Sequence, residues 1–391
     1  MIEGVLQRLA ARRAPMIERL RRLVEVNSFT DHPEGGARVG EMLAADLAAI
    51  PGMTVEARPS SRYAPHLVAW SAAAAKGADG CTALVGHLDT VFPPGTFEGW
   101  SESGDIARGP GVLDMKGGLC VVLEALGALA AAGLLSAIPV RLIIVSDEEV
   151  GSPEGRPLIQ SELRGAAAAL VFEAGRKADA IITARKGTGA VTAVAGGKAA
   201  HAGNGHAQGA NAIWALARFV DGAQLLTDYA RGITVNVGKV SGGQGKNTVP
   251  DRAEALLDVR FERLADAEAT VARLHQVAAA AAAGIPGTRL TLEGGVARTP
   301  LERTPDNVAL YQAYAACARA EGLGDGEAPL VGGGSDASST AAIGIASIDG
   351  LGPRGTGFHT REELIEVSTL LPKAAALARF LASRAGAAHT A

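Results

Sequence analysis

Imidazole and carboxylate side chains follow the ends of several apolar segments of the chain. "TALVGHLDT" ends on His87, with Asp89 two residues later, "VRLIIVSDEE" ends on the adjacent Glu148 and Glu149, and "AALVFEAG" ends on Glu173. These are hard oxygen and imidazole donors, and no thiolate is among them. The pattern therefore favours a divalent cation that takes part in chemistry over a structural zinc knot of cysteines.

Two further candidates lie elsewhere in the sequence. Asp114 stands in "GPGVLDMKGG" just before an apolar helical segment, and His359 stands in "GFHTREE" after the late strand "GIASIDG". Taken alone, an aspartate before a helix is most simply an N-cap, and a lone His-x-Asp is most often a surface feature. Taken together, all of them lie where the carboxyl ends of parallel strands would bring them into one place.

Such a set suits two divalent ions with one bridging carboxylate and a shared water. Consecutive residues that leave a strand point in roughly opposite directions, so only one of the two adjacent glutamates can be a ligand. Its neighbour would then face the substrate and act as the base. Asp147, the first acid of "SDEEVGS", has no role in this scheme, and His206 is left open as well.

The elements that must hold these residues form an α/β pattern. Apolar runs at 81–86, 140–146 and 167–172 predict buried strands. Helical spacing predicts helices over 12–26, 38–49, 117–133 and 368–386, the third opening on glycines. Alternating strands and helices are typical of a mainly parallel sheet covered by helices.

Residues 186–297 differ from the rest. Strands are predicted at 189–197, 233–240, 253–261 and 288–294, and helices at 209–223 and 265–283. The order β-α-β-β-α-β is the ferredoxin-like pattern. We therefore expect a discontinuous catalytic domain over 1–185 and 298–391 with a small α+β domain inserted over 186–297.

Composition excludes several classes of protein. The 391 residues carry a formal net charge of −4 and no densely basic stretch, which argues against a nucleic-acid partner. No segment approaches the roughly 20 apolar residues that cross a bilayer. The cysteines Cys81, Cys120 and Cys317 are far apart without CxxC spacing, which favours free thiols in a reducing cytoplasm.

The motifs "GHLDTV", "GPGVLDMKGG", "SDEEVGS", "VFEAG" and "GFHT" resemble, in order and over nearly the whole chain, the dinuclear-zinc metallopeptidase family M-20. This family includes aminoacylases, deacylases and glutamate carboxypeptidases. "KAAHAG", "GANAI", "DVRF" and "GGGSDA" are similar to the branch of carboxypeptidase G type. The resemblance implies a zinc-peptidase-like catalytic domain and an inserted dimerisation, or lid, domain.

The resemblance also implies roles for the metal site. His87 and Glu173 would bind one metal, Glu149 and His359 the other, and Asp114 would bridge them, followed by a cis peptide at Asp114–Met115. Asp89 would orient His87 through its far ring nitrogen, and Glu148 would be the general base. Zinc is expected, with cobalt or manganese as alternatives.

For the substrate, the resemblance implies residues of the insert and of the late glycine segment. His201 would reach from the partner subunit of a homodimer and stabilise the oxyanion. Arg260 and Asn247 would hold the carboxylate and carbonyl of the substrate, and Arg298 matches a further arginine of the glutamate-specific branch. Backbone N–H groups of "GGGSDA", with Gly333, Gly334 and Ser335, would surround the terminal carboxylate.

The sequence thus predicts an amide hydrolase that releases a C-terminal amino acid, with glutamate preferred, from a peptide or N-acyl conjugate. One alternative keeps the chemistry but changes the substrate, as in acetylornithine deacetylase or succinyl-diaminopimelate desuccinylase. An alternative of another class is an inactive binding protein on the same fold. Its mark would be a lost ligand or a lost base, and neither is lost here.

Overall fold

The computed structural model describes residues 2–385, and it divides the chain into two compact units. The first unit takes in the described residues up to Ala184, then Arg303–Leu330, then those from Ser335 onward. The second unit consists of Arg185–Glu302 and Val331–Gly334. The bounds predicted for the insert, 186–297, lie inside this second unit.

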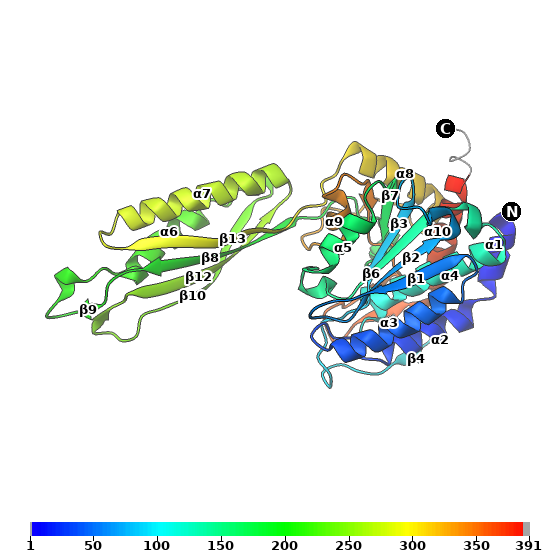
Figure 1. Ribbon diagram of the computed structural model, residues 1–391, viewed down its shortest axis with the longest axis horizontal. Helices are drawn as coiled ribbons and strands as arrows, with labels where there is room; N and C mark the ends of the chain where they lie inside the picture. Colours follow the sequence, from blue (N-terminus) through cyan, green and yellow to red (C-terminus); the bar gives the residue numbers. More distant parts are fainter. Residues whose placement is uncertain (1, 386–391) are drawn as a thin grey trace. The chain divides into compact units, whose positions relative to one another are not determined.

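A six-stranded sheet forms the centre of the first unit, in the order β1-β2-β6-β3-β7-β14. Its strands are β1 (Met53–Arg58), β2 (His66–Ser71), β3 (Thr82–His87), β6 (Val140–Val145), β7 (Ala168–Val171) and β14 (Ser347–Ile348). The strands β6, β3, β7 and β14 run parallel, and β1 and β2 add an antiparallel edge. The mainly parallel sheet predicted from the sequence is confirmed (Figure 1).

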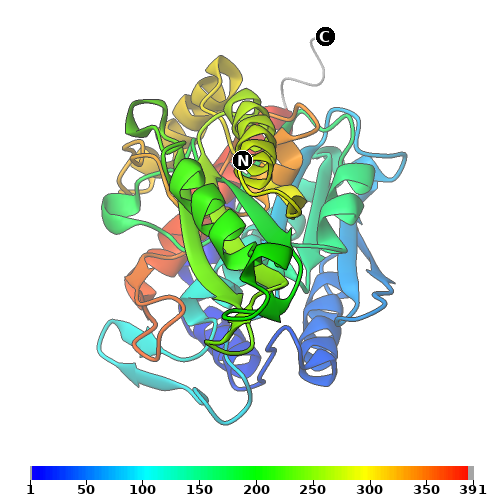
Figure 2. The ribbon, with the colours of Figure 1, turned by 90° about the vertical axis from the view of Figure 1, so that its left-hand side faces the viewer.

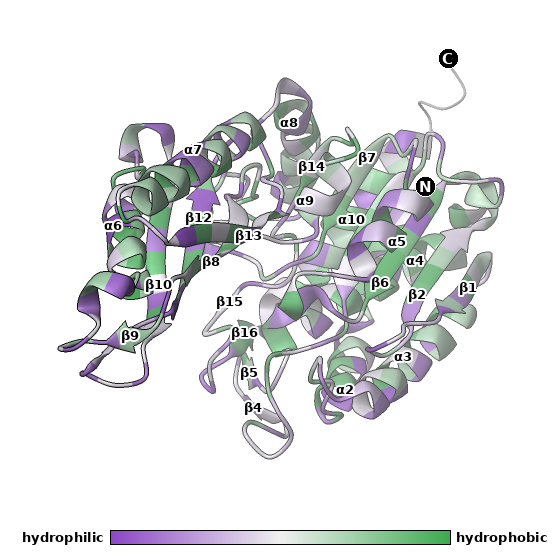
Figure 3. Ribbon diagram, turned by 60° about the vertical axis from the view of Figure 1, so that its left-hand side comes forward, coloured by the Kyte–Doolittle hydropathy of each residue, from purple (hydrophilic) through white to green (hydrophobic). Residues whose placement is uncertain are grey.

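The central strands are buried on both faces, which explains their continuous apolar sequences. Leu84 of β3, Ile144 of β6 and Leu170 of β7 belong to the main hydrophobic core. Val85 of β3 and Val171 of β7 point to the other face and are just as buried. The hydrophobic colouring of this sheet in Figure 3 follows from this double burial.

Helices cover this sheet. They are α1 (Ile2–Ala10), α2 (Arg13–Val24), α3 (Pro33–Ala48), α4 (Gly117–Ala131), α5 (Gly155–Glu162), α8 (Pro305–Ala320), α9 (Ala337–Ala341) and α10 (Leu370–Ala385). α3 begins earlier than the predicted residue 38, because Pro33 takes the first turn, where a missing N–H costs nothing. Over residues 2–385, no helix is both long enough and apolar enough to cross a membrane.

A small antiparallel sheet holds together two segments that are far apart in the sequence. Its order is β15-β16-β5-β4, with β4 (Ser101–Ser103), β5 (Ile106–Arg108), β15 (Gly355–Thr356) and β16 (Leu364–Glu366). The pairing of β16 with β5 places the segment around residue 360 beside the loop that follows residue 108. Both segments carry residues of the candidate site.

The second unit contains a four-stranded antiparallel sheet in the order β10-β12-β8-β13. The chain order is β8 (Gly187–Gly196), α6 (Ala212–Gln224), β10 (Thr234–Gly242), β12 (Arg252–Phe261), α7 (Leu264–Ala283) and β13 (Arg289–Arg298). α6 and α7 lie side by side on one face of the sheet (Figures 1 and 2), and alternate residues of β8 are buried. The predicted ferredoxin-like order is confirmed. Two-residue strands β9 (Ala200–His201) and β11 (Thr248–Val249) pair separately.

Candidate metal centre

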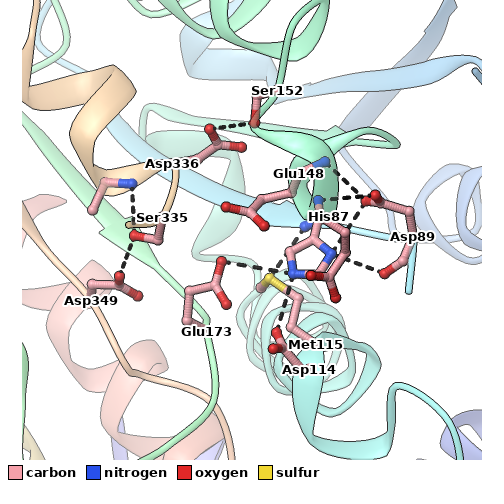
Figure 4. Close-up of polar contacts among 12 residues, drawn as sticks. His87, Asp89, Asp114, Met115, Glu148, Ser152, Glu173, Ser335, Asp336 and Asp349 are labelled. Atoms are coloured by element: carbon pink, nitrogen blue, oxygen red, sulfur yellow. Dashed lines mark hydrogen bonds and ion pairs between the residues drawn. The ribbon is translucent and has the colours of Figure 1, made fainter. Parts of the chain in front are cut away.

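The carboxyl ends of β3, β6 and β7 gather the predicted ligands at one edge of the large sheet. His87 is the last residue of β3, Glu148 and Glu149 follow β6 in a short 3₁₀ turn, and Glu173 follows β7. Ligand atoms of His87, Glu148 and Glu173 lie within 4.8 Å of one another, and so do those of His87, Asp114 and Glu149. Figure 4 shows the carboxylates of Glu148 and Glu173 directed toward the ring of His87.

Asp114 lies between the two histidines. Its Oδ1 is 3.2 Å from Nε2 of His87, and its Oδ2 is 3.3 Å from Nε2 of His359. The same Nε2 of His359 is 3.0 Å from Oε2 of Glu149. Each oxygen of one carboxylate thus faces a different imidazole, which is the arrangement needed to share that carboxylate between two cations.

Mutual charge pairing shifts the pKa values of the histidines and of Asp114. Hydrogen bonds to Asp114 and Glu149 raise the pKa of His359 to about 10. Burial disfavours the charged ring of His87, but the neighbouring Glu173 and Asp114 raise its pKa well above the usual value. Burial acts against ionisation of Asp114 too, yet its bonds to both histidines hold its pKa well below its usual range. Without a metal, the positive charges of the protonated His87 and His359 rings therefore offset the negative charge of Asp114.

The positive charge nearby is too small to keep the carboxyl groups of Glu149 and Glu173 at their ordinary pKa values. Burial raises the pKa of Glu149 to about 7, against the effect of its bond to His359. Burial and the charge of Asp114 raise the pKa of Glu173 well above its ordinary value. Oε1 of Glu173 is buried and makes no hydrogen bond among the described residues, and its ion-pair contact with Nε2 of His87 is long, at 3.7 Å. An unsatisfied buried acceptor beside other carboxylates fits a bound cation.

Asp89 organises the turn that carries the two glutamates. Its Oδ1 accepts from the backbone N–H of Glu148, and its Oδ2 from the backbone N–H of Glu149, both at 3.2 Å. Nδ1 of His87 lies 3.0 Å from the backbone oxygen of Asp89 and 3.3 Å from its Oδ1. The contact predicted between Asp89 and the far nitrogen of His87 is present, and it involves both the main chain and the side chain.

Asp147, which had no role in the sequence scheme, closes the same turn from the other side. It is fully buried, and its Oδ2 accepts from the backbone N–H groups of Glu154 and Gly155 at 2.7 and 3.0 Å. It therefore satisfies N–H groups at the start of α5, which have no partner within the helix. Its task is to shape the turn, and it does not join the ligand cluster.

The segment around Asp114 is fixed by a residue that the sequence did not single out. The peptide bond Asp114–Met115 is cis. The carboxylate of Glu363, fully buried, accepts from the backbone N–H groups of Gly111, Leu113 and Asp114, and burial raises its pKa to about 7. The only available signal was its position in "HTREE", four residues after His359.

Helix α4 starts on glycines because it approaches β7 closely. A Cβ on Gly118 would lie 2.0 Å from the backbone oxygen of Phe172. This contact joins the chain that follows Asp114 to the residue that precedes Glu173. The two glycines at the start of the helix are therefore part of how the site is built.

In the second unit, His201 and Asn247 lie together. His201 in β9 pairs with Thr248 in β11, and the backbone oxygen of Asn247 accepts from the N–H of Ala202. Nδ1 of the exposed His201 accepts from the backbone N–H groups of Gly203 and Asn204, both at 3.1 Å. The proton of the neutral ring is therefore on Nε2, which makes that nitrogen a hydrogen-bond donor.

The predicted carboxylate-binding residues of the second unit surround its glycine segment. Arg260 makes a two-pronged ion pair with Asp258 at 2.8 and 2.9 Å, and its Nη1 lies 3.5 Å from the oxygen of Gly332. Arg298 is buried, and its Cδ would be 2.5 Å from a Cβ on Gly334.

Arg185, which the sequence did not indicate, donates to the oxygen of Gly333 at 3.1 Å. Three arginines therefore border Gly332–Gly334. The carboxylate of Asp258 already occupies Arg260, so any substrate carboxylate must share that guanidinium with it.

Ser335 belongs to the first unit and is buried. Its hydroxyl donates to Asp349 and accepts from the N–H of Ala337 (Figure 4). The neighbouring Asp336 accepts from the hydroxyl of Ser152, in the turn after Glu149. Within the first unit, Asp336 is thus held against the turn that follows the two glutamates. His206 starts an exposed 3₁₀ turn in the second unit.

Comparison with known proteins agrees with this geometry. The family model described as Peptidase family M20/M25/M40 matches residues 83–383. Carboxypeptidase G2 of Pseudomonas sp. (strain RS-16) is 29% identical over 361 residues, 91% of this chain and 86% of that protein. Succinyl-diaminopimelate desuccinylase of Bordetella parapertussis is 26% identical, over 74% of this chain and 79% of that protein.

Among solved structures, a tripeptidase from Staphylococcus aureus superposes with a TM-score of 0.80 at 22% identity, covering 96% of this chain and 99% of that chain. This likeness concerns the fold. The family model covers most of the chain, including the segments that carry His87, Asp114, the two adjacent glutamates, Glu173 and His359. The chain therefore belongs to peptidase family M20/M25/M40, and it is a metal-dependent hydrolase of that family.

Proposed function

We propose that this hydrolase releases a C-terminal amino acid, with glutamate as the leading candidate, from peptide or N-acyl conjugates. The observation that carries the proposal is the convergence of His87, Asp114, Glu149, Glu173 and His359 at one edge of the sheet, with Glu148 beside them. The preference for glutamate is supported by the similarity to carboxypeptidase G2, which extends over 91% of the chain.

The proposed centre holds two divalent cations, zinc first, with cobalt or manganese as alternatives. His87 and Glu173 would hold one ion, Glu149 and His359 the other, and Asp114 both. Support comes from the two oxygens of Asp114, which face different histidines, and from the unsatisfied Oε1 of Glu173. When bound, such ions polarise the scissile carbonyl and acidify a water between them.

Glu148 is the proposed general base. It takes a proton from the attacking water and delivers it to the leaving amine nitrogen. Its backbone is held by Asp89, and its side chain lies near His87 and Glu173. Asp89 keeps the proton of His87 on Nδ1, so that Nε2 presents a lone pair to the cation.

The second unit is proposed to supply substrate contacts and the homodimer interface. His201, donating from Nε2, would stabilise the oxyanion in the active site of the partner subunit. Asn247, Arg260 and Arg298, with Gly333, Gly334 and Ser335 of the glycine segment, would bind the carbonyl and carboxylate of the substrate. Support comes from the grouping of three arginines around that segment. A cytoplasmic location is kept as a proposal, in keeping with three free and buried cysteines.

A second candidate is deacylation of an N-acyl amino acid. It is favoured by relatives named acetylornithine deacetylase, at 30% identity over 48% of this chain, and succinyl-diaminopimelate desuccinylase. The same centre would cleave the same type of bond, and only the recognised side chain would differ. The hypothesis of an inactive binding protein is not retained, because the chain belongs to an enzyme family and keeps every proposed ligand and the base.

A substrate panel tests the proposal. Benzoyl conjugates of glutamate, alanine and ornithine are assayed with acetylornithine and succinyl-diaminopimelate, each with added zinc, cobalt or manganese. We expect the glutamate conjugate to give the highest kcat/KM. Equal rates for all conjugates would remove the preference for glutamate, and a preference for acetylornithine or succinyl-diaminopimelate would establish the second candidate.

The Glu148→Gln variant tests the mechanism on the best substrate. Loss of a positioned base should lower kcat roughly 10²- to 10⁴-fold, while the metal content stays that of the unmodified enzyme. Glu34→Gln, at a side chain that is 91% exposed, is the matched control and should leave both kcat and metal content unchanged. Normal turnover by Glu148→Gln would refute the assigned role.

A further inference from the structure

The carboxylate of Glu363 is bound entirely by backbone N–H groups of the segment that carries Asp114. Its Oε1 accepts from Leu113 at 2.8 Å and from Asp114 at 3.0 Å, and its Oε2 accepts from Gly111 at 3.2 Å. The residue is 0% exposed. A buried carboxylate that takes three donors from one short segment fixes the path of that segment more firmly than one neutral hydrogen bond would.

Strand pairing on the C-terminal side of Glu363 fixes the position of this residue. The next residue, Leu364, begins β16 and pairs with Arg108 at the end of β5, and Gly111 lies three residues further along. On the other side, β15 pairs with β16, so the residues between them form the turn of a hairpin. His359 lies in that turn with a φ of 61°, a left-handed conformation that non-glycine residues adopt only when neighbouring contacts hold them there.

Glu363 therefore connects two proposed ligands that are far apart in the sequence. Its carboxylate holds the main chain of Asp114, and its own main chain belongs to the hairpin that carries His359. The two ligands then meet, with Nε2 of His359 at 3.3 Å from Oδ2 of Asp114. A shift in the carboxylate of Glu363 would change the distance between the shared ligand and the histidine of the second cation.

We propose that Glu363 is a positioning residue of the metal centre, which sets the geometry of Asp114 relative to His359 without contacting a cation. The inference rests on the proposed function, because it takes Asp114 and His359 to be metal ligands. It predicts that loss of Glu363 weakens metal binding in a protein that is still folded.

The neighbouring Glu362 provides a matched control. It lies in the same hairpin turn, but its side chain is 85% exposed, and its one side-chain contact among the described residues is a long ion pair of 3.6 Å with Arg108. Removing it deletes the same type of side chain from the same turn and leaves the Asp114 segment untouched.

The experiment compares zinc affinity, by chelator competition, for the full chain and the variants Glu363→Ala, Glu363→Gln and Glu362→Ala. Metal-free circular dichroism and melting curves establish folding. Loss of a group that orients a ligand typically costs roughly 10- to 100-fold in metal affinity, and we expect this for Glu363→Ala. Glu362→Ala should bind zinc like the unmodified chain.

Glu363→Gln gives a graded result and remains informative if Glu363→Ala does not fold. Its amide oxygen can accept from the N–H groups of Leu113 and Asp114. Its NH₂ group would face the N–H of Gly111, which is also a donor, so that hydrogen bond is lost. Zinc affinity should therefore fall between that of the unmodified chain and that of Glu363→Ala. The visible absorption of the cobalt-loaded protein should shift as well, because this spectrum reports the ligand geometry.

A folded Glu363→Gln or Glu363→Ala variant with unchanged zinc affinity and an unchanged cobalt spectrum would overturn the inference. If the unmodified chain itself binds no zinc or cobalt, the metal centre fails, and the role of Glu363 fails with it. If the unmodified chain binds both metals and the Glu363 variants bind them equally well, the proposed function stands and only this inference is lost.

Discussion

The substitution Asp89→Asn tests how the centre is held together, because it removes charge without changing shape. The two oxygens of Asp89 serve different partners. Oδ1 faces the N–H of Glu148 and Nδ1 of His87, and Oδ2 accepts from the hydroxyl of Thr30 at 2.8 Å and from the N–H of Glu149. All of these partners act as hydrogen-bond donors. The NH₂ group of an asparagine is itself a donor, so in place of Oδ1 or Oδ2 it cannot accept their hydrogen bonds.

The loss of stability depends on which of its two orientations the amide introduced by Asp89→Asn adopts. With its NH₂ in place of Oδ1, the asparagine opposes both the N–H of Glu148 and the ring of His87. With its NH₂ in place of Oδ2, the hydroxyl of Thr30 can rotate, since the backbone oxygen of Thr90 lies 3.4 Å away as another acceptor. Only the N–H of Glu149 is then unsatisfied. One buried donor without a partner costs about 1–3 kcal/mol, so the metal-free variant should be less stable by that amount.

The assay is urea unfolding of the chelator-treated protein followed by tryptophan fluorescence, together with zinc affinity at fixed pH. We expect a lower urea midpoint and zinc binding weakened roughly 10- to 100-fold, because the orientation of His87 is loosened. Thr30→Val is the control, since it replaces the hydroxyl by a methyl group and leaves Asp89 with its charge and its contacts to His87 and to the N–H groups of both glutamates, so zinc affinity should be unchanged. An Asp89→Asn protein with an unchanged midpoint and unchanged affinity would refute the reasoning.

Two further predictions concern protons and packing. The pKa of His359 is raised to about 10 and that of His87 well above its usual value, so both rings hold protons at pH 7 when no metal is bound. Ligation requires neutral rings, so zinc binding should release protons, and affinity should rise between pH 6 and 8, roughly tenfold per pH unit for each proton displaced. Calorimetry in buffers of different protonation heats checks this, and a pH-independent affinity would contradict it. Gly118→Ala would place a methyl group 2.0 Å from a backbone oxygen and should destabilise the protein by about 1–3 kcal/mol or more in thermal melts. Gly127→Ala, in the same helix with open space around it, should be neutral or stabilising; equal melting temperatures for the two variants would show that the helix start can move away from Phe172.

The sequence predicted best what depends on local pattern. The strands that end near His87, Glu148 and Glu173 were visible because strands buried on both faces are continuously apolar. In the second unit, the strand at 189–197 was predicted from its alternating apolar residues, and alternate residues of β8 are indeed buried. The convergence of the ligand types on one edge followed from the rule that parallel strands share a carboxyl end.

The sequence did not reveal what depends on contacts between distant segments. The edge strand β1, "MTVEAR", was missed because it is largely solvent-facing and lacks a strong apolar signal. The strand β2, "HLVAWS", was missed as well, although it is almost wholly buried. The bonds of Glu363 to the Asp114 segment join residues about 250 positions apart. No local pattern distinguishes such a buried carboxylate from an exposed one. The same is true of Arg185, whose partner is a glycine oxygen 148 residues later.

The order of the chain has a consequence for biosynthesis. Four of the proposed ligands precede the second unit in the sequence, and the fifth, His359, comes only after that whole unit. The strand pairing that brings the hairpin of His359 beside β5 forms only when β16 has left the ribosome. A chain still being made therefore cannot assemble the complete proposed centre before the residues of β16 have been synthesised.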